Sequence, residues 1–145
     1  MNHTYLFEQA SWEVTGYYIG ESGQLVEAEG KSIITQQREI WVIQGVMRLR
    51  TEEVTEIGNI YEVVPFKQGV DNTSWSSMND ALGRIEGRFI LIEDTILSIF
   101  QTSNGRYRGT EYLRQLSDHQ YASKGALLKG LTKLSSWSVQ LDRKS

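Results

Sequence analysis

The side chains best suited to acid–base chemistry, nucleophilic attack or metal binding are few in this sequence of 145 residues. It has no cysteine, which excludes disulfides, thiolate ligands and a cysteine nucleophile. Its two histidines, His3 and His119, have no partner at the spacing of metal ligands. Asp118 beside His119 suits a solvated turn better than a catalytic triad, and Gly83 to Gly87 lacks the lysine and helix of a phosphate-binding loop. We therefore expect no metal and no cofactor, and we assign no catalytic residue.

Glu111 is the ionisable residue that the pattern singles out. It shares one strand face with Tyr107 and Leu113, whereas the opposite face carries Arg108 and Arg114. Because alternate strand residues point to opposite sides, the arginines mark the solvent face and Glu111 points inward. Burial there would raise the pKa of the carboxyl unless it is paired. Two interpretations stay open: a hydrated or arginine-paired carboxylate near an opening, and a functional group inside the protein.

The aromatic side chains are the second feature that could indicate function, because most of them fall on the strand faces that are expected to point inward. They could fill a small barrel or line a cavity within it. A cavity is favoured by the small residues on the same faces, which are Ala28, Gly30, Ser32, Gly45, Gly83 and Gly87. The residues that we predict to bind a ligand in such a cavity are Trp41, Met47, Trp75, Phe89, Tyr107, Glu111, Tyr121 and Trp137.

Short runs rich in aromatic and β-branched residues recur along the chain, separated by turn residues. Asn104-Gly105 predicts a tight type I′ hairpin turn, and Thr51 to Glu56 is interpreted as a charged connection. Tyr5 to Phe7 predicts a single helical turn that plugs one end of the domain. The expected strands are residues 12–19, 25–36, 39–50, 59–66, 73–78, 83–92, 95–101, 106–116, 120–128 and 131–141.

This spacing predicts an all-β fold, a single-domain antiparallel up-and-down β-barrel of about 8–10 strands with a short N-terminal helical turn. Closure would remove the exposed edges that an open sheet of this size carries. A Greek-key sandwich would need longer crossovers, for which residues 51–58 and 67–72 are the candidates. We expect residues 1–145 to form one domain.

The charge and the hydrophobic pattern of the chain limit the kinds of partner that we expect it to bind. The net charge is −3 at pH 7, and the basic residues are interspersed with acidic ones, so nucleic acid is not an expected partner. The first residues lack the features of a secretory signal, and no apolar run reaches membrane-spanning length. We expect a cytoplasmic protein without a membrane partner, whose partner is a small apolar molecule or a second copy of the chain.

The pattern of the whole chain resembles the calycin group of lipocalin-like and fatty-acid-binding-protein-like barrels. It has Trp12 on the first strand after a turn, about ten meander strands, and Trp137 near the end. The resemblance implies a lipocalin-like barrel domain that holds a small ligand. The sequence departs from both family motifs, because Ala10 replaces the first glycine of the lipocalin Gly-x-Trp and Ser136-Trp137-Ser138 replaces the Arg-x-Tyr of fatty-acid-binding proteins. Fatty acids are therefore not the expected ligand.

We predict a non-enzymatic binding protein that holds a small, mostly apolar ligand inside the barrel. The alternative is a ligand-free barrel that acts as a protein–protein interaction or homodimerisation module. It is suggested by Ile90, Ile92, Leu97 and Ile99, which are expected to point outward. A third alternative is a barrel isomerase or lyase that uses Glu111, a chemistry that the resemblance to calycin-like barrels implies for some members.

Overall fold

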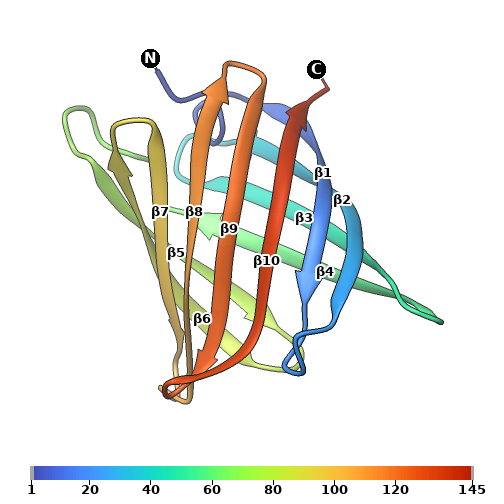
Figure 1. Ribbon diagram of the computed structural model, residues 1–145. Coiled ribbons are helices and arrows are strands. Elements are labelled where there is room, and N and C mark those ends of the chain that lie inside the picture. The colour runs from blue at the N-terminus through green and yellow to red at the C-terminus, as the bar shows by residue number, and fades with distance from the viewer. Residues whose placement is uncertain (1, 145) are drawn as a thin grey trace.

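Ten antiparallel strands form a closed barrel in the computed structural model, which describes residues 2–144 apart from the side chain of Val54 (Figure 1). Each strand pairs with the next along the chain, and β1 pairs with β10 to close the ring. The strands are β1 (Ala10–Ile19), β2 (Leu25–Gln36), β3 (Trp41–Arg50), β4 (Val54–Val63), β5 (Asn72–Asn79), β6 (Gly83–Ile92), β7 (Thr95–Thr102), β8 (Tyr107–Ser117), β9 (Gln120–Lys129) and β10 (Thr132–Arg143). The predicted all-β up-and-down barrel is confirmed.

Buried and exposed side chains alternate along the strands, and this alternation explains why the strands form one wall with a common inner face. On β1, Trp12 and Val14 are buried, whereas Glu13 and Thr15 are exposed. A shift of one residue in the register would turn the apolar set outward, so burial fixes the register. The apolar face of each strand therefore points into a shared interior.

The structure corrects the expected start of β4 and the expected type of the β7–β8 turn, although the hairpin predicted at Asn104-Gly105 does form. β4 begins at Val54, inside the run expected to be a connection: Glu56 lies on the solvent face of β4, where it pairs with Arg48 at 3.2 Å, whereas Glu52 and Glu53 lie in the bend before the strand. Gly105 has a positive φ of 72°, but the non-glycine residues with positive φ in the described part of the chain are Leu6 and Glu93, so Asn104 does not adopt the type I′ conformation. The loop from Ser103 to Arg106 is instead held by the Asn104 side chain, whose Oδ1 accepts from Arg106 N–H at 2.9 Å.

Residues 5–7 close one end of the barrel, as predicted, but they form a hydrogen-bonded turn and not a helical turn. Leu6 has a φ of 74°, which lies outside the helical region, and Glu8 N–H donates to Thr4 O at 3.2 Å. The Leu6 side chain is fully buried. Burial of a leucine stabilises by about 1.5–3 kcal/mol, which offsets a left-handed backbone cost of about 1–2 kcal/mol.

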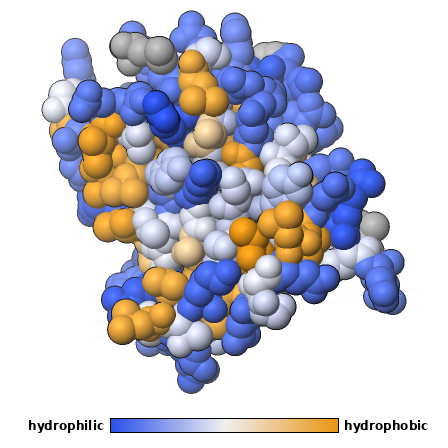
Figure 2. Space-filling view, viewed as in Figure 1, coloured by the Kyte–Doolittle hydropathy of each residue, from blue (hydrophilic) through white to orange (hydrophobic). Residues whose placement is uncertain are grey.

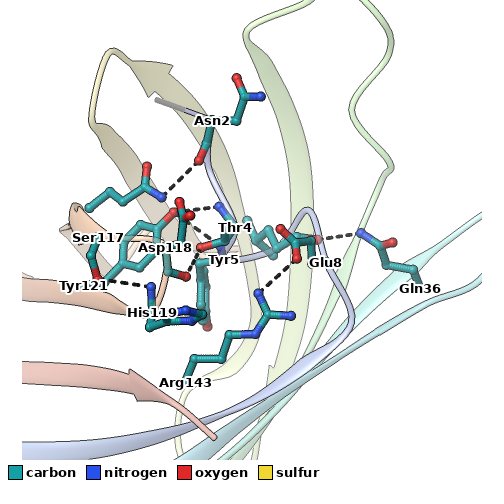
Figure 3. A network of polar contacts seen from close by, with 12 residues as sticks. Asn2, Thr4, Tyr5, Glu8, Gln36, Ser117, Asp118, His119, Tyr121 and Arg143 are labelled. Carbon is teal, nitrogen blue, oxygen red and sulfur yellow. Dashed lines mark hydrogen bonds and ion pairs between the residues drawn. The ribbon is translucent and has the colours of Figure 1, made fainter. Parts of the chain in front are cut away.

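Tyr121 on β9 anchors this turn (Figure 3). Its hydroxyl accepts from the backbone N–H of Thr4 at 3.1 Å and of Tyr5 at 3.3 Å. It also lies 2.9 Å from His3 Nδ1, while His3 Nε2 lies 2.9 Å from the carbonyl oxygen of Glu93. A carbonyl can only accept, so Nε2 carries the proton and Nδ1 accepts from the Tyr121 hydroxyl. Burial lowers the pKa of His3, which keeps the ring in this neutral form.

An ion pair and hydrogen bonds to the ends of three other strands also hold residues 3–8 over this end of the barrel. Arg143 at the end of β10 pairs with Glu8 at 3.0 Å, and the Gln36 side chain at the end of β2 donates to Leu6 O at 2.7 Å. Thr4 Oγ1 donates to Asp118 O at 2.8 Å, beyond the end of β8. We call residues 3–8 the plug, because they hold this end of the barrel shut.

Candidate ligand-binding cavity

A cavity of about 340 Å³ occupies the barrel interior below the plug. Tyr5 of the plug lines it at one end, and it extends toward the opposite end, where Tyr17, Leu82 and Leu127 line it. Its wall is mostly aromatic and aliphatic. The polar residues that line it are Lys31, Ser32, Asn59, Asn79, Ser98, Glu111, Ser123 and Ser135. Such a wall, with few polar groups, is typical of small-molecule sites.

A row of three residues crosses the wall beside this cavity. Glu111 on β8 is paired in register with Gly125 on β9, which is paired with Trp137 on β10. A Cβ on Gly125 would overlap the indole ring of Trp137, so glycine lets the ring lie across β9. Trp137 Nε1–H thereby reaches over β9 and donates to Glu111 Oε2 at 2.7 Å. The glycine is what brings a tryptophan and a carboxylate from non-adjacent strands into contact.

Burial sets the electrostatics of this row. It raises the pKa of Glu111 from 4.5 to about 7, and the hydrogen bond from Trp137 opposes this increase without cancelling it. Glu111 is partly buried and lines the cavity. Burial also raises the pKa of Tyr5 and of Tyr61 well above the usual tyrosine value, so both hydroxyls stay neutral at physiological pH.

The same aromatic-over-glycine arrangement occurs twice more. Trp75 on β5 lies over its register partner Gly87 on β6, and Phe100 on β7 lies over Gly109 on β8. A Cβ on either glycine would overlap the aromatic ring. Aromatic rings over glycines of the neighbouring strand help to pin the register of designed sheets. Here they also hold Trp75 and Phe100 in the cavity wall.

Five of the eight predicted ligand-binding residues line the cavity: Met47, Trp75, Phe89, Glu111 and Trp137. The structure places the other three elsewhere. Trp41 packs against Phe7 and Phe66 beside the plug, with ring centroids 5.6 and 6.2 Å away. Tyr121 holds the plug through its hydroxyl, and Tyr107 lies beside the β7–β8 turn, where its N–H donates to Thr102 Oγ1 at 3.1 Å.

Tyr5 and Tyr61 line the cavity, and Gly125 lets Trp137 reach Glu111, but the predicted set contains none of the three. Tyr61 packs edge-on to Trp75 with ring centroids 5.1 Å apart, and its place on the inward face of β4 follows from alternation. Tyr5 reaches the cavity only because the plug folds over the barrel end. Gly125 has no side chain to signal its role, and register alone reveals it.

A groove of about 660 Å³ lies on the outside of the wall where β3, β4 and β5 meet. β4 pairs with β5 only from Tyr61 to Val63, so the described part of β4 before Tyr61 pairs with β3 alone. Figure 1 shows the β3–β4 hairpin projecting away from the barrel. The groove and the cavity share lining residues Lys31, Gly45, Val46 and Asn59. They therefore adjoin across this thinly paired wall.

Within residues 2–144 no cluster of three or more His, Asp or Glu side chains could hold a metal ion. The same residues include no helix with the length and apolar character needed to cross a membrane.

Comparison with known proteins finds similarity in structure and none in sequence families. The barrel is similar to an S-type phycobiliprotein lyase from Guillardia theta, with a TM-score of 0.64, 14% identity, and coverage of 95% of this chain and 89% of that chain. At this identity the likeness shows the fold alone. No family model matches the sequence, and no curated protein matches it.

Two further solved structures match with lower scores. One is a putative AttH from Nitrosomonas europaea, with a TM-score of 0.35, 12% identity, and coverage of 94% of this chain and 51% of that chain. The other is an N-terminal dehydratase from the difficidin assembly line, with a TM-score of 0.31, 9% identity, and coverage of 97% and 80%.

Proposed function

We propose that this chain is a calycin-like binding protein that holds a small, mostly apolar molecule inside its barrel. The observation that carries the proposal is the cavity of about 340 Å³, which aromatic and aliphatic side chains enclose around a single carboxylate. A ligand that buries on the order of 300 Å² of apolar surface gains roughly 7 kcal/mol before the costs of association, so weak to moderate affinity is expected, and tight binding would need polar complementarity. The barrel neighbour from Guillardia theta supports the fold on which this proposal depends.

The first test is Ala28→Phe, which places a large ring in the cavity. Ala28 lines the cavity and is 5% exposed. Native mass spectrometry of the purified wild-type protein should reveal a carried ligand, or a panel of apolar molecules should shift the fluorescence of Trp75 and Trp137. Ala28→Phe should lower the occupancy or the response at least tenfold, because the ring takes the space of the ligand. Glu27→Gln, a change at the exposed neighbouring position, is the control.

Circular dichroism of Ala28→Phe checks that the barrel still forms. The proposal would be abandoned if the wild-type protein carried no ligand and no member of the panel changed its fluorescence.

A second candidate function is homodimerisation through the outer face of β6 and β7. Ile92 is 51% exposed and Ile99 is 45% exposed, and Ile90 is paired in register with Leu97 on the same face. Figure 2 shows apolar side chains gathered on the left-hand side, over the region where Figure 1 places β7. The rim carries both signs of charge in the pair of Arg114 with Asp94, at 3.3 Å. A surface that pairs with a copy of itself needs such self-complementarity.

A catalytic role of Glu111 and a cytoplasmic location stay predictions. The carboxyl has a pKa near 7 and faces a cavity, which is the property that acid–base chemistry would require.

A further inference from the structure

Charge is distributed very unevenly around the cavity. Among the described residues that line it, Lys31 and Glu111 are the two that carry charge. Lys31 is exposed and also lines the outer groove, so its ammonium group has access to solvent. Glu111 lies inside, and none of the ion pairs of the described residues includes it. An ionised carboxylate in such a site needs a cation or additional donors to offset its lost hydration.

Among the described residues, a single hydrogen bond reaches the Glu111 carboxylate. Trp137 Nε1–H donates to one oxygen of Glu111, and the Tyr5 hydroxyl is engaged with Ser32 Oγ at 2.7 Å. The Trp75 indole nitrogen is buried against Gly87, without a partner among the described residues.

No described group in register with Glu111 supplies a positive charge. Its partner on β7 is Ser98 and its partner on β9 is Gly125. Of the titratable groups inside the cavity, Tyr5 and Tyr61 are neutral. The one hydrogen bond of the described residues that reaches the Glu111 side chain comes from Trp137, so the carboxylate has no cationic partner within the protein.

We propose that the ligand of this cavity carries a protonated nitrogen on a mostly apolar body, and that the Glu111 carboxylate binds that nitrogen. This inference rests on the proposed binding function and specifies the chemical class of the ligand. The aromatic wall supports it, because Trp75, Tyr61 and Phe100 line the cavity and the faces of aromatic rings stabilise a cation within a desolvated site. A ligand with a carboxylate head would meet the like charge of Glu111 and is disfavoured.

Three probes with one body and different heads test the inference: phenylbutylamine, phenylbutanol and phenylbutyric acid. The cavity has the volume of about ten water molecules, which suits a body of this size. Titration calorimetry at about pH 8 should give the amine an affinity about tenfold higher than the alcohol, and the acid the lowest affinity, because a charge-assisted hydrogen bond contributes about that factor.

Glu111→Gln should reduce the amine to the affinity of the alcohol, since the amide keeps the shape and loses the charge. Glu62→Gln is the matched control, because Glu62 is an exposed glutamate that lines the outer groove. It should leave all three affinities unchanged. In the wild-type protein, the affinity for the amine should fall at least threefold from about pH 8 to about pH 5 as Glu111 takes up a proton, while that for the alcohol stays constant. This titration needs no variant to fold.

Three outcomes would overturn the inference. Equal affinity for the three heads would leave the proposed binding function standing and remove the role of Glu111. Loss of amine binding in Glu62→Gln but not in Glu111→Gln would place the amine in the outer groove. Absence of binding by all three probes would refute the inference, and absence of any carried ligand in the wild-type protein would then count against the proposed function itself.

Discussion

At the scale of single residues, the most informative feature is the row of Glu111, Gly125 and Trp137. The alternation of charged and apolar residues on β8 correctly predicts that Glu111 points inward. The hydrogen bond from Trp137 depends on the register of three strands and on the missing side chain of Gly125. The sequence can predict that Glu111 points inward, because alternation determines the face of the strand on which a residue lies. It cannot predict the contact with Trp137, because alternation does not determine which residues of other strands lie beside it.

Glu111→Gln should make the protein more stable at neutral and mildly alkaline pH. Its pKa is raised on folding from 4.5 to about 7, so the folded state holds a proton that the unfolded state releases between these values. The free energy of unfolding of the wild-type protein therefore falls across this window, by at most about 3 kcal/mol from this group. Urea unfolding at several pH values should show that the variant lacks this decrease.

His3 changes the pH dependence of the free energy of unfolding in the opposite direction. The stability curve of the wild-type protein must therefore be subtracted from that of Glu111→Gln. Its pKa is lowered on folding, and its contribution is present above 6.5 and is lost as the pH falls through the folded-state pKa. Subtraction of the wild-type curve from the Glu111→Gln curve removes this shared contribution. A difference that stays flat from about pH 5 to about pH 8 would show that Glu111 is hydrated as in water. Glu62→Gln, the same substitution at an exposed position, is the control.

At the scale of elements, the barrel wall is uneven. β4 pairs with β3 along its whole length but with β5 only over three registered pairs, Tyr61–Ser77, Glu62–Ser76 and Val63–Trp75. Regular strand pairing elsewhere is longer, as between β6 and β7. A stretch with few cross-strand hydrogen bonds belongs to the low-stability end of a fold. The wall between the cavity and the outer groove is therefore the place where the barrel should open most easily.

A disulfide between Ile60→Cys and Met78→Cys should close this stretch. The two positions follow the last registered pair, both side chains are exposed, and the natural chain has no cysteine to interfere. Hydrogen exchange of peptides over residues 55–60 should be fast in the reduced double variant and at least tenfold slower in the oxidised one. The reduced form is the internal control. Equal and strong protection in both forms would mean that this wall is already closed.

At the scale of the whole molecule, closure of the ring and docking of the plug create the interior. The plug is buried against Trp12 and Tyr121, and it joins the ends of β2 and β10 through Gln36 and Arg143. Only after this closure does the remaining interior become a cavity with one shut end. The outer face of β6 and β7 stays exposed and apolar in the single barrel.

Ile99→Lys tests whether that face joins two copies. Sedimentation velocity over a range of concentrations should show a dimer for the wild-type protein and a monomer for the variant, because a buried lysine without a partner opposes association. Leu131→Lys is the control, since Leu131 is 96% exposed in the turn between β9 and β10, away from this face. A wild-type protein that stays monomeric at the highest concentration would remove the homodimer as a candidate function.

The sequence by itself determined an up-and-down barrel of about 8–10 strands and the inward direction of most aromatic residues, because period-two alternation and turn residues are local signals. It did not determine how far along the barrel each inward residue lies. Trp41 and Tyr121 point inward, yet the plug covers one and engages the other, while Met47, Trp75, Phe89, Glu111 and Trp137 line the cavity. Height along the axis depends on the stagger of all ten strands and on where residues 3–8 dock, and these are set only when the ring closes.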